Sequence, residues 1–509
     1  MTRPDRIDGD WRDDHEHEWH RLSPWMIAVK PVEQLPQLIP LFLAIAFAGR
    51  GAPDLTLIIT LVALPLVTVV PWLATRYQVT AEHVRLRHGV LTRTTATARR
   101  DRIRSVDLTA SPPHRILGLQ KVRIGTGGDR KSSVVELNSI PAVDAERLRR
   151  HLMATAVRTS PGVTGSVEDT DSGAARPGSV AAPDVLARFR PAWLRFAPFS
   201  LAGLATVAAL VGLGFQAGYE AGLFERGATA AEHAADRILD IGVPIVVSAG
   251  IVVVVAAGAL VSVAAYLLAF WGFTLTRTPD DDRLHLRRGL LTTIATSLDA
   301  HRVRGVHLHE PILMRPVRGA RLNAIATGSS KKPLLMPPAP AAEVIGVGQL
   351  VTHEGDELTV GLRRHGHGAL TRRLTRALWS GAVLAVALVA AVAGPLTWPW
   401  LILGAAVIVG AVVLGVVRYR NLGVRVTDRA VVIAPPRVAR HRYVVDRDGV
   451  VGWATSASFF QRRRGVETLT LATAAGDEAY AAVDLTPEDA TGLMCTVSPD
   501  LVGPFVERN

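Results

Sequence analysis

The 509-residue sequence contains a single cysteine, Cys495. One thiol cannot form an intrachain disulfide, and it cannot build a zinc site from several thiolates. The sequence therefore excludes a small extracellular module held together by disulfides. We expect the polar segments of the chain to lie inside the cell.

The sequence also lacks the motifs that mark common catalytic and cofactor sites. Gly125-Thr126-Gly127-Gly128 is not followed by the Lys-Ser/Thr of a phosphate-binding loop, and we interpret it as a strand end and turn. Neither a nucleophile elbow nor a dinucleotide fingerprint is found. We therefore predict no catalytic residue, no cofactor and no enzyme activity.

Two histidine clusters could suggest a metal site. After His15-Glu16, the last position of a zinc-protease motif is Trp19 instead of a histidine. His365-Gly366-His367-Gly368 lies in an arginine-rich segment. We interpret the first cluster as part of a solvated arm and the second as a basic loop beside a membrane, and we predict no metal site.

Acidic residues are fewer than basic ones, with 45 Asp and Glu against 57 Lys and Arg and a net charge of +12. Such a charge can indicate nucleic-acid binding. The sequence, however, has no helix-turn-helix, zinc-finger or aromatic RNA-binding signature, so we expect no nucleic-acid partner. The arginines mostly flank apolar runs, where basic residues oppose translocation and attract anionic lipid headgroups.

Apolar runs are what the sequence has in abundance: 49% of its residues are hydrophobic and its mean hydropathy is +0.24. A run of about twenty such residues can cross a hydrocarbon core about 30 Å thick. The runs form three pairs, which predict three transmembrane helical hairpins: Leu35–Gly49 with Leu55–Ala74, Phe196–Phe215 with Ile241–Phe273, and Leu378–Gly394 with Trp398–Val417. Their centres hold almost no ionisable residues, which argues against a transporter or a membrane enzyme.

A strand pattern follows each hairpin. Val84, Leu86 and His88 alternate with Arg85 and Arg87, which predicts a strand with one buried face. Pro141 indicates a closing helix in the first unit, and Thr486 and Pro487 mark one more clearly in the third, as N-cap and first helical residue. The order of hairpin, strands and helix occurs three times.

The predicted fold class is therefore a mixed membrane protein, with six transmembrane α-helices alternating with three β-rich domains that each end in a helix. By residue number, we divide the chain into a polar arm (1–34), hairpin 1 (35–74), domain 1 (75–156), a flexible linker (157–190), hairpin 2 (191–273), domain 2 (274–353), a basic linker (354–376), hairpin 3 (377–417) and domain 3 (418–509).

The first domain contains segments that recur in altered form in the second: Tyr77-Gln78-Val79-Thr80, Arg87-His88-Gly89-Val90-Leu91, Arg102-Ile103-Arg104-Ser105-Val106 and Arg115-Ile116-Leu117-Gly118-Leu119. In these segments the chain resembles the bacterial pleckstrin-homology (PH) domain of the YdbS-like membrane protein family. The resemblance implies two packed antiparallel sheets closed by a C-terminal helix, and it loosely suggests a role in envelope stress or peptide tolerance. The third domain departs from the pattern at Ala434-Pro435-Pro436 and at Phe459–Gly465.

Two arginine clusters are the candidate binding residues: Arg99, Arg100, Arg102 and Arg104 in domain 1, and Arg462, Arg463 and Arg464 in domain 3. Arginines beside a bilayer can bind anionic headgroups, each contributing on the order of 1 kcal/mol, or they can bind a partner. The alternative is that they are solvated charges that keep the domains in the cytoplasm.

Together these patterns predict a non-enzymatic, multi-pass protein of the cell membrane, acting as a scaffold or as an interaction module at the membrane surface. Its domains and both termini are expected in the cytoplasm, with the acidic segment Gly218–Asp240 outside. The expected partners are membrane lipids and either another protein or a second copy of the chain. The alternative function is a transporter or an export accessory protein.

Overall fold

The protein is described by a computed structural model in which the chain forms two compact units. Unit 1 comprises Met1–Arg188, Gly272–Arg302 and Thr327–Lys331, and unit 2 comprises Phe189–Trp271, Val303–Ala326 and Lys332–Asn509. The structure describes residues 19–27, 29–30, 33, 69–70, 72–80, 82–89, 93–100, 103, 105–125, 134–158, 183–199, 212, 216, 243–279, 282–327, 333–352, 356–390 and 398–505.

The first sheet of unit 1 has four antiparallel strands in the order β1-β2-β3-β4. They are β1 (His20–Arg21), β2 (Arg76–Val79), β3 (His83–His88) and β4 (Thr94–Arg99). In β3, Val84 and Leu86 are buried while Arg85 and Arg87 are exposed, which confirms the predicted alternation for these residues. His88, predicted on the buried face, is exposed, because it is the last residue of the strand.

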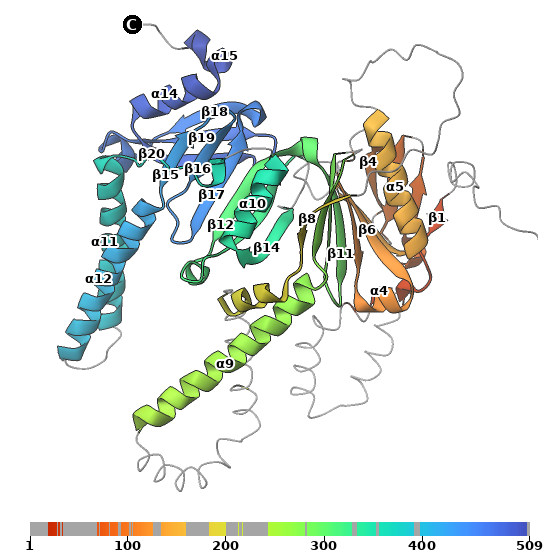
Figure 1. The fold of residues 1–509 in the computed structure, drawn as a ribbon, viewed down its shortest axis with the longest axis horizontal. Helices are drawn as coiled ribbons and strands as arrows, with labels where there is room; N and C mark the ends of the chain where they lie inside the picture. Colours follow the sequence, from red (N-terminus) through yellow and green to blue (C-terminus); the bar gives the residue numbers. More distant parts are fainter. Residues whose placement is uncertain are drawn as a thin grey trace, which may run out of the picture. The chain divides into compact units, whose positions relative to one another are not determined.

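The second sheet of unit 1 has seven strands in the order β7-β6-β5-β11-β10-β9-β8. Its elements are β5 (Ser105–Ala110), α4 (Pro112–Ile116), β6 (Leu119–Gly125), β7 (Val134–Pro141), β8 (Asp184–Arg188), β9 (Thr274–Thr278), β10 (Arg283–Arg288), β11 (Thr293–Asp299) and η4 (Ala300–Arg302). Helix α5 (Ala142–Arg158) follows β7 and lies against β6 (Figure 1). Leu148 and Leu152, one turn apart on α5, are buried in the same core cluster as Val122 of β6.

Unit 2 contains a six-stranded sheet, β14-β13-β12-β17-β16-β15, and a three-stranded sheet, β18-β19-β20. The strands are β12 (Val303–Glu310), β13 (Gly319–Ala326), β14 (Leu334–Pro340), β15 (Gly423–Val426), β16 (Ala430–Ala434), β17 (Arg440–Asp446), β18 (Val450–Ser456), β19 (Glu467–Thr473) and β20 (Ala479–Leu485). The short helices are η3 (Pro191–Phe199), η5 (Ile312–Met314), α10 (Ala341–Thr352), η6 (Asp356–Leu358), η7 (Arg447–Gly449), α13 (Phe459–Arg462), α14 (Pro487–Val497), α15 (Pro499–Val502) and η8 (Gly503–Phe505).

The closing helix of the third repeat begins as predicted. Pro487 is the first residue of α14, and the Thr486 hydroxyl accepts a hydrogen bond from the backbone N–H of Asp489 at 3.2 Å. This bond satisfies one of the amides that a helix N-terminus leaves without a partner.

In each unit, one sheet combines strands from two consecutive repeats, and we call these strand pairings joints. In the first joint β5 pairs with β11, and Val106 faces Ser297. In the second joint β12 pairs with β17, and Val306 faces Val444. As a result, the residues predicted as domain 2 (274–353) are divided, because β9–β11 belong to unit 1 and β12–β14 to unit 2.

A short strand before each predicted hairpin pairs with the first strand after it. His20 of β1 faces Tyr77 of β2, and Arg188 of β8 faces Thr274 of β9. In the third repeat, Arg363 forms an isolated bridge with Val424 of β15. The two ends of each hairpin segment are therefore held about 5 Å apart, the spacing of paired strands. β8 lies inside the segment 157–190 that composition predicts as a linker, because pairing with β9 orders its C-terminal end.

Three long helices occupy the predicted hairpin segments: α9 (Val243–Phe270), α11 (His367–Ala390) and α12 (Trp398–Arg420). Among the described residues, Trp400–Arg420 alone is a helix both long and apolar enough to span a membrane. Almost all of the first hairpin, 35–74, and most of the first half of the second lie outside the described residues. The structure thus supports one candidate span and does not confirm six.

Helices α11 and α12 lie side by side in unit 2 (Figure 1). A Cβ atom added at Gly381 would come within 2.5 Å of the Cβ of Ala411, and one added at Gly415 would come within 3.1 Å of the Cβ of Ala377. Small residues at these crossing points let the two backbones approach closely, as in many pairs of membrane helices.

This packing gives a test of the third hairpin. Gly381→Val should separate α11 from α12 and destabilise the protein by about 1–3 kcal/mol, the usual cost of overpacking. Gly404→Val is the matched control, because a Cβ at Gly404 of α12 meets no atom within 4 Å. Thermal unfolding in detergent should show a lower Tm for Gly381→Val alone, and equal Tm values would contradict the packing.

Candidate functional site

The best-defined site in the structure is the base of the third hairpin, where α11 and α12 meet strand β20. We call it the third root. At its centre, Asp484 is 1% exposed and has a φ of +63°. Its carboxylate pairs with Arg372, accepts a hydrogen bond from Arg373 Nη2 at 2.5 Å, and accepts another from Gln461 Nε2 at 3.0 Å. Aspartate tolerates the left-handed backbone better than most residues, and these partners compensate its buried charge.

A buried histidine completes the third root. The ring of His365 is 3% exposed, and its Nδ1 donates a hydrogen bond to the Val483 carbonyl at 2.8 Å. The His365 carbonyl accepts a bond from the Tyr419 hydroxyl of α12 at 2.6 Å. Burial lowers the pKa of His365, although the Val483 carbonyl and the Asp484 charge oppose this. The neutral ring therefore acts as a link between the two helices and β20.

The other repeats have similar contacts at the start of the closing helix. In the first, the backbone N–H of Ser23, before the hairpin, donates to the Ser139 carbonyl at 3.2 Å. In the second, the Tyr266 hydroxyl of α9 donates to the Pro338 carbonyl at 2.7 Å. Ser139 also has a positive φ, of 60°. Each root thus fastens a hairpin end to the last strand of its repeat.

The turn α13 projects aromatic and basic side chains beside the third root. Phe459 and Phe460 are 64% and 70% exposed, with their rings edge to face at 5.5 Å. Arg462, Arg463 and Arg464 follow and are exposed. The turn is fixed by a capping box between Ser458 and Gln461, and Arg372 Nη2 donates to the Ser458 hydroxyl at 3.4 Å. We call these five exposed residues the aromatic-basic turn.

The equivalent turns of the other repeats also expose an apolar side chain. Ile116 of α4 is 84% exposed and Ile312 of η5 is 46% exposed. An arginine lies close to each in sequence, Arg115 and Arg315 respectively. Sequence reasoning missed these apolar residues; their signal was a bulky apolar residue within a polar turn. Exposed apolar and basic side chains together are suited to the interface between headgroups and acyl chains.

The predicted arginine clusters differ in their structural setting. Arg99 is exposed at the end of β4, whereas Arg100 is 6% exposed and its Nη1 donates to the Thr80 carbonyl at 3.2 Å. Arg102 and Arg104 lie outside the described residues. The structure therefore places the cluster of domain 3 on one exposed turn, while Arg100 of domain 1 supports the fold. Headgroup or partner binding by either cluster stays a prediction.

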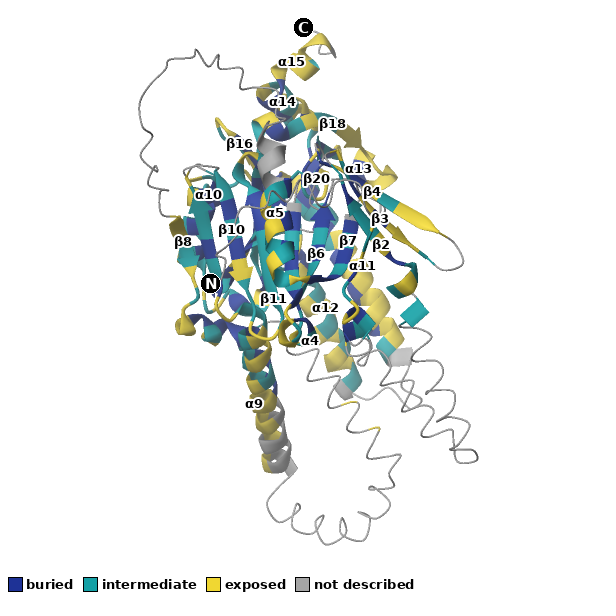
Figure 2. Ribbon diagram, turned by 90° about the vertical axis from the view of Figure 1, so that its right-hand side faces the viewer, coloured by how far each residue is buried: buried dark blue, intermediate teal, exposed yellow. Residues whose placement is uncertain are grey.

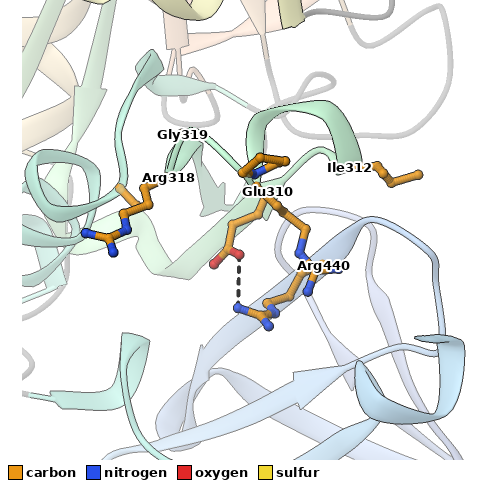
Figure 3. Close-up of a pocket in the computed structure, with 8 residues that line it drawn as sticks. Glu310, Ile312, Arg318, Gly319 and Arg440 are labelled. Atoms are coloured by element: carbon orange, nitrogen blue, oxygen red, sulfur yellow. Dashed lines mark hydrogen bonds and ion pairs between the residues drawn. The ribbon is translucent and has the colours of Figure 1, made fainter. Parts of the chain in front are cut away.

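A cavity of about 680 Å³ lies beside η5 in unit 2 (Figure 3). Its lining residues are Glu310, Ile312, Arg315, Pro316, Arg318, Gly319, Ala341 and Arg440. Glu310 pairs with Arg440 at 3.1 Å, and two further arginines line the same space. The excess of cations favours an anionic group.

Serine, histidine and glutamate side chains also meet at the first root. The Ser111 hydroxyl and a Glu33 carboxylate oxygen both approach Nδ1 of the buried His114, at 2.6 and 3.3 Å. The Ser139 hydroxyl lies 3.4 Å from Nε2 of the same ring, so a hydroxyl and a carboxylate do flank opposite ring nitrogens, as in a catalytic triad. Ser139 and His114 are each 1% exposed, however, so a substrate has no access to this hydroxyl, and we interpret the cluster as a buried structural contact. Among the described residues, no group of three or more potential metal ligands is found.

Comparison with known proteins identifies the repeat. A family model described as the bacterial PH domain matches residues 35–156, 230–348 and 381–493, well over half of the chain. The chain therefore belongs to the bacterial PH-domain family, with three copies of its unit. Each match includes apolar residues before the strands, although the second begins at residue 230, between the two apolar runs of its predicted hairpin. No curated protein and no solved structure matches the chain.

The third root gives a second test. Asp484→Asn keeps a residue that accepts the positive φ but removes the charge that compensates Arg372 and Arg373. We expect a loss of about 3 kcal/mol, as for other broken buried ion pairs. Asp428→Asn, at an exposed aspartate, is the control. Thermal unfolding should show a Tm several degrees lower for Asp484→Asn only; an unchanged Tm would mean that the buried cluster does not hold the root.

Proposed function

We propose that the protein is a six-span membrane protein whose three PH-like domains act at the cytoplasmic surface as a non-enzymatic scaffold or interaction module. The observation that carries this proposal is the apolar surface of the long helices. The most apolar stretch of Trp400–Arg420 has a hydropathy of 2.7, and 6% of it is buried. Figure 2 shows α9, α11 and α12 as largely exposed. Such surfaces are costly in water and suited to lipid.

The strand pairings at the ends of the hairpin segments support an even number of crossings. The chain enters and leaves each hairpin segment at paired strands, so it returns to the side from which it started. Each hairpin segment contains two apolar runs, and one crossing by each run returns the chain to its starting side. All three domains then share one compartment. The arginines at the ends of α11 and α12, such as Arg376 and Arg418, favour the cytoplasm.

The exposed turns support a contact with the membrane surface. The aromatic-basic turn lies beside the first turns of α11, where that helix would enter the bilayer. Phenylalanine rings can insert among the headgroups, and each nearby arginine adds on the order of 1 kcal/mol on an anionic leaflet. Ile116 and Ile312 offer the same contact in the other repeats.

A transporter or an export accessory protein is the alternative. Transport sites normally place ionisable residues at bilayer depth. From Val243 to Phe270, α9 has none, and α12 has none before Arg418. This composition favours the scaffold. A flux of substrate into reconstituted vesicles, abolished by a substitution inside a span, would favour the transporter.

Topology can be tested with single cysteines in a Cys495→Ser background. Val143 of α5, Leu350 of α10 and Leu501 of α15 are exposed, one in each repeat. Cysteines there should escape an impermeant thiol reagent in intact cells and react after permeabilisation. A cysteine at Ala230, outside the described residues, should react in intact cells. Labelling of any of these three positions from outside would contradict the proposed common compartment.

Membrane contact of the aromatic-basic turn can be measured in nanodiscs. An environment-sensitive fluorophore on Phe460→Cys, in the Cys495→Ser chain, should emit at shorter wavelength in anionic nanodiscs and be quenched by brominated lipid. The same fluorophore on Leu501→Cys should respond little. Replacing Arg462, Arg463 and Arg464 with Gln should weaken the response at low salt, because screening removes surface attraction at high salt. Equal quenching at both positions would count against the contact.

A further inference from the structure

Two strands at sheet ends, β4 and β18, each have one edge that no described strand covers. Among the strands that the structure describes, β4 borders only β3, and β18 borders only β19. Their sequences are TTATAR and VVGWATS, rich in β-forming and small residues, without proline, and uncharged except for Arg99. Proteins usually protect an edge with proline, lysine or a covering segment, because its free N–H and C=O groups attract another strand.

These two strands are the equivalents of the strands that form the joints. β5, β12 and β18 each precede a turn that begins after Ser111, Pro311 and Ser458 respectively. Counting back five residues from these positions gives Val106, Val306 and Trp453. β4, β11 and β17 are each the third strand after the predicted hairpin of their repeat. A joint links the strand of the β5 type in one repeat to the strand of the β11 type in the next. Among the described strands, β18 of repeat 3 therefore has no following repeat to pair with, and β4 of repeat 1 has no preceding repeat to pair with.

The two observed joints have the same register. Val106 faces Ser297, and its equivalent Val306 faces Val444. Ser297 and Val444 both lie two residues before the end of their strands, at Asp299 and Asp446. The corresponding residue of β4 is Thr97, since β4 ends at Arg99. The same register would pair Gly452 with Ala98, Trp453 with Thr97, Ala454 with Ala96, Thr455 with Thr95, and Ser456 with Thr94.

A glycine in β18 has open space beside it. At the second joint, a Cβ on Gly305 would lie 2.0 Å from the Val444 carbonyl oxygen, so only glycine fits there. Its equivalent in β18 is Gly452, yet a Cβ on Gly452 would meet no atom within 4 Å. Gly305 has a φ of +139°, whereas Gly452 has no positive φ, and the first joint has Ser105 at the equivalent position, so a joint accepts a side chain there. The space beside Gly452 therefore shows only that the described residues leave this part of β18 uncovered.

We propose that β18 of one copy of this chain pairs with β4 of a second copy, and so repeats the joint between molecules. All five predicted pairs are uncharged, so no like charges oppose one another. Because the two edges are different surfaces, the contact is head to tail and leads to a row or a closed ring. The occupant is thus a second copy of the chain, and the proposal does not depend on the number of spans.

Cross-linking of two distinguishable chains tests the pairing. Both carry Cys495→Ser; one has Thr95→Cys and a large tag, the other Thr455→Cys and a small tag. Thr95 and Thr455 are exposed, and directly opposite residues have Cα atoms about 4.5–5.5 Å apart, close enough for a disulfide. Oxidation of co-expressed chains in isolated membranes should give a linked pair of the two tags. Either chain alone should not, because like edges do not meet in a head-to-tail contact.

Two controls test the register and the contact between β18 and β4. Ala454 is exposed on the opposite face of β18, so Thr95→Cys with Ala454→Cys should link poorly. Thr94 and Ser456 are exposed and face one another in the predicted register, so Thr94→Lys with Ser456→Lys should lower the yield of linked pair because like charges then meet. Thr94→Glu with Ser456→Lys should restore the yield. Equal Tm values for these variants would show that all are folded.

Three results would overturn the proposal. The first is no linked pair at any oxidant concentration. The second is a disulfide formed within one chain when Thr95→Cys and Thr455→Cys are on the same molecule, with no linked pair between tags. The third is a cross-link from the Thr455→Cys chain to a protein of another mass, formed whether or not the Thr95→Cys chain is present, since this would mean that a different occupant covers β18.

Discussion

The structure depends on the pairing of strand edges. An edge strand presents a row of backbone N–H and C=O groups, and leaving them unpaired in a buried setting costs free energy at every second residue. The second sheet of each repeat has only three strands of its own, and in the first two repeats the next repeat supplies the fourth neighbour. Stability is therefore shared between neighbours, as in repeat proteins whose units rely on adjacent interfaces.

The roots couple this sheet system to the helices. Asp484 is contacted by two arginines of α11 and by Gln461 of the exposed turn, so helix, closing strand and turn share one carboxylate. One member of this cluster cannot move away alone without a cost, because its loss leaves another charge uncompensated in a buried site. A displacement of α11 would therefore be passed to the turn and to the start of α14. The third hairpin is thus rigidly attached to its domain, without an intervening flexible linker.

The local structure could be predicted from the sequence because it depends on local patterns. The alternation in β3 and the cap at Thr486 follow from strand period and from unsatisfied helix amides. The joints could not be predicted in this way. β11 contains Thr293, Ile294, Ala295, Thr296 and Ser297, a run without a clear apolar face, and nothing local indicates that it borders β5. Domain boundaries drawn from hairpin to hairpin therefore missed the exchange of sheets between repeats.

The candidate site was predicted in part for a similar reason. Arginine is abundant along the whole chain, so a cluster in sequence does not distinguish Arg100, which bonds to the Thr80 carbonyl, from the exposed Arg462–Arg464. The distinction depends on which side of a turn faces the core. The exposed phenylalanines of α13 could have been found from sequence, because two adjacent rings in a polar turn have no buried position to occupy.

The first joint also means that the sheet of the first repeat cannot be completed until the second repeat has been synthesised. Val106 of β5 leaves the ribosome long before Ser297, its partner in β11. At about 5–20 residues per second, roughly 190 residues of further synthesis take on the order of 10–40 s. During that time the N-terminal PH-like domain carries an unfinished sheet, and in the proposed topology two more spans are inserted before the missing strand arrives. We expect chaperones to bind the unpaired edge of such a nascent chain. Several chains synthesised on one polysome would also bring these edges close together.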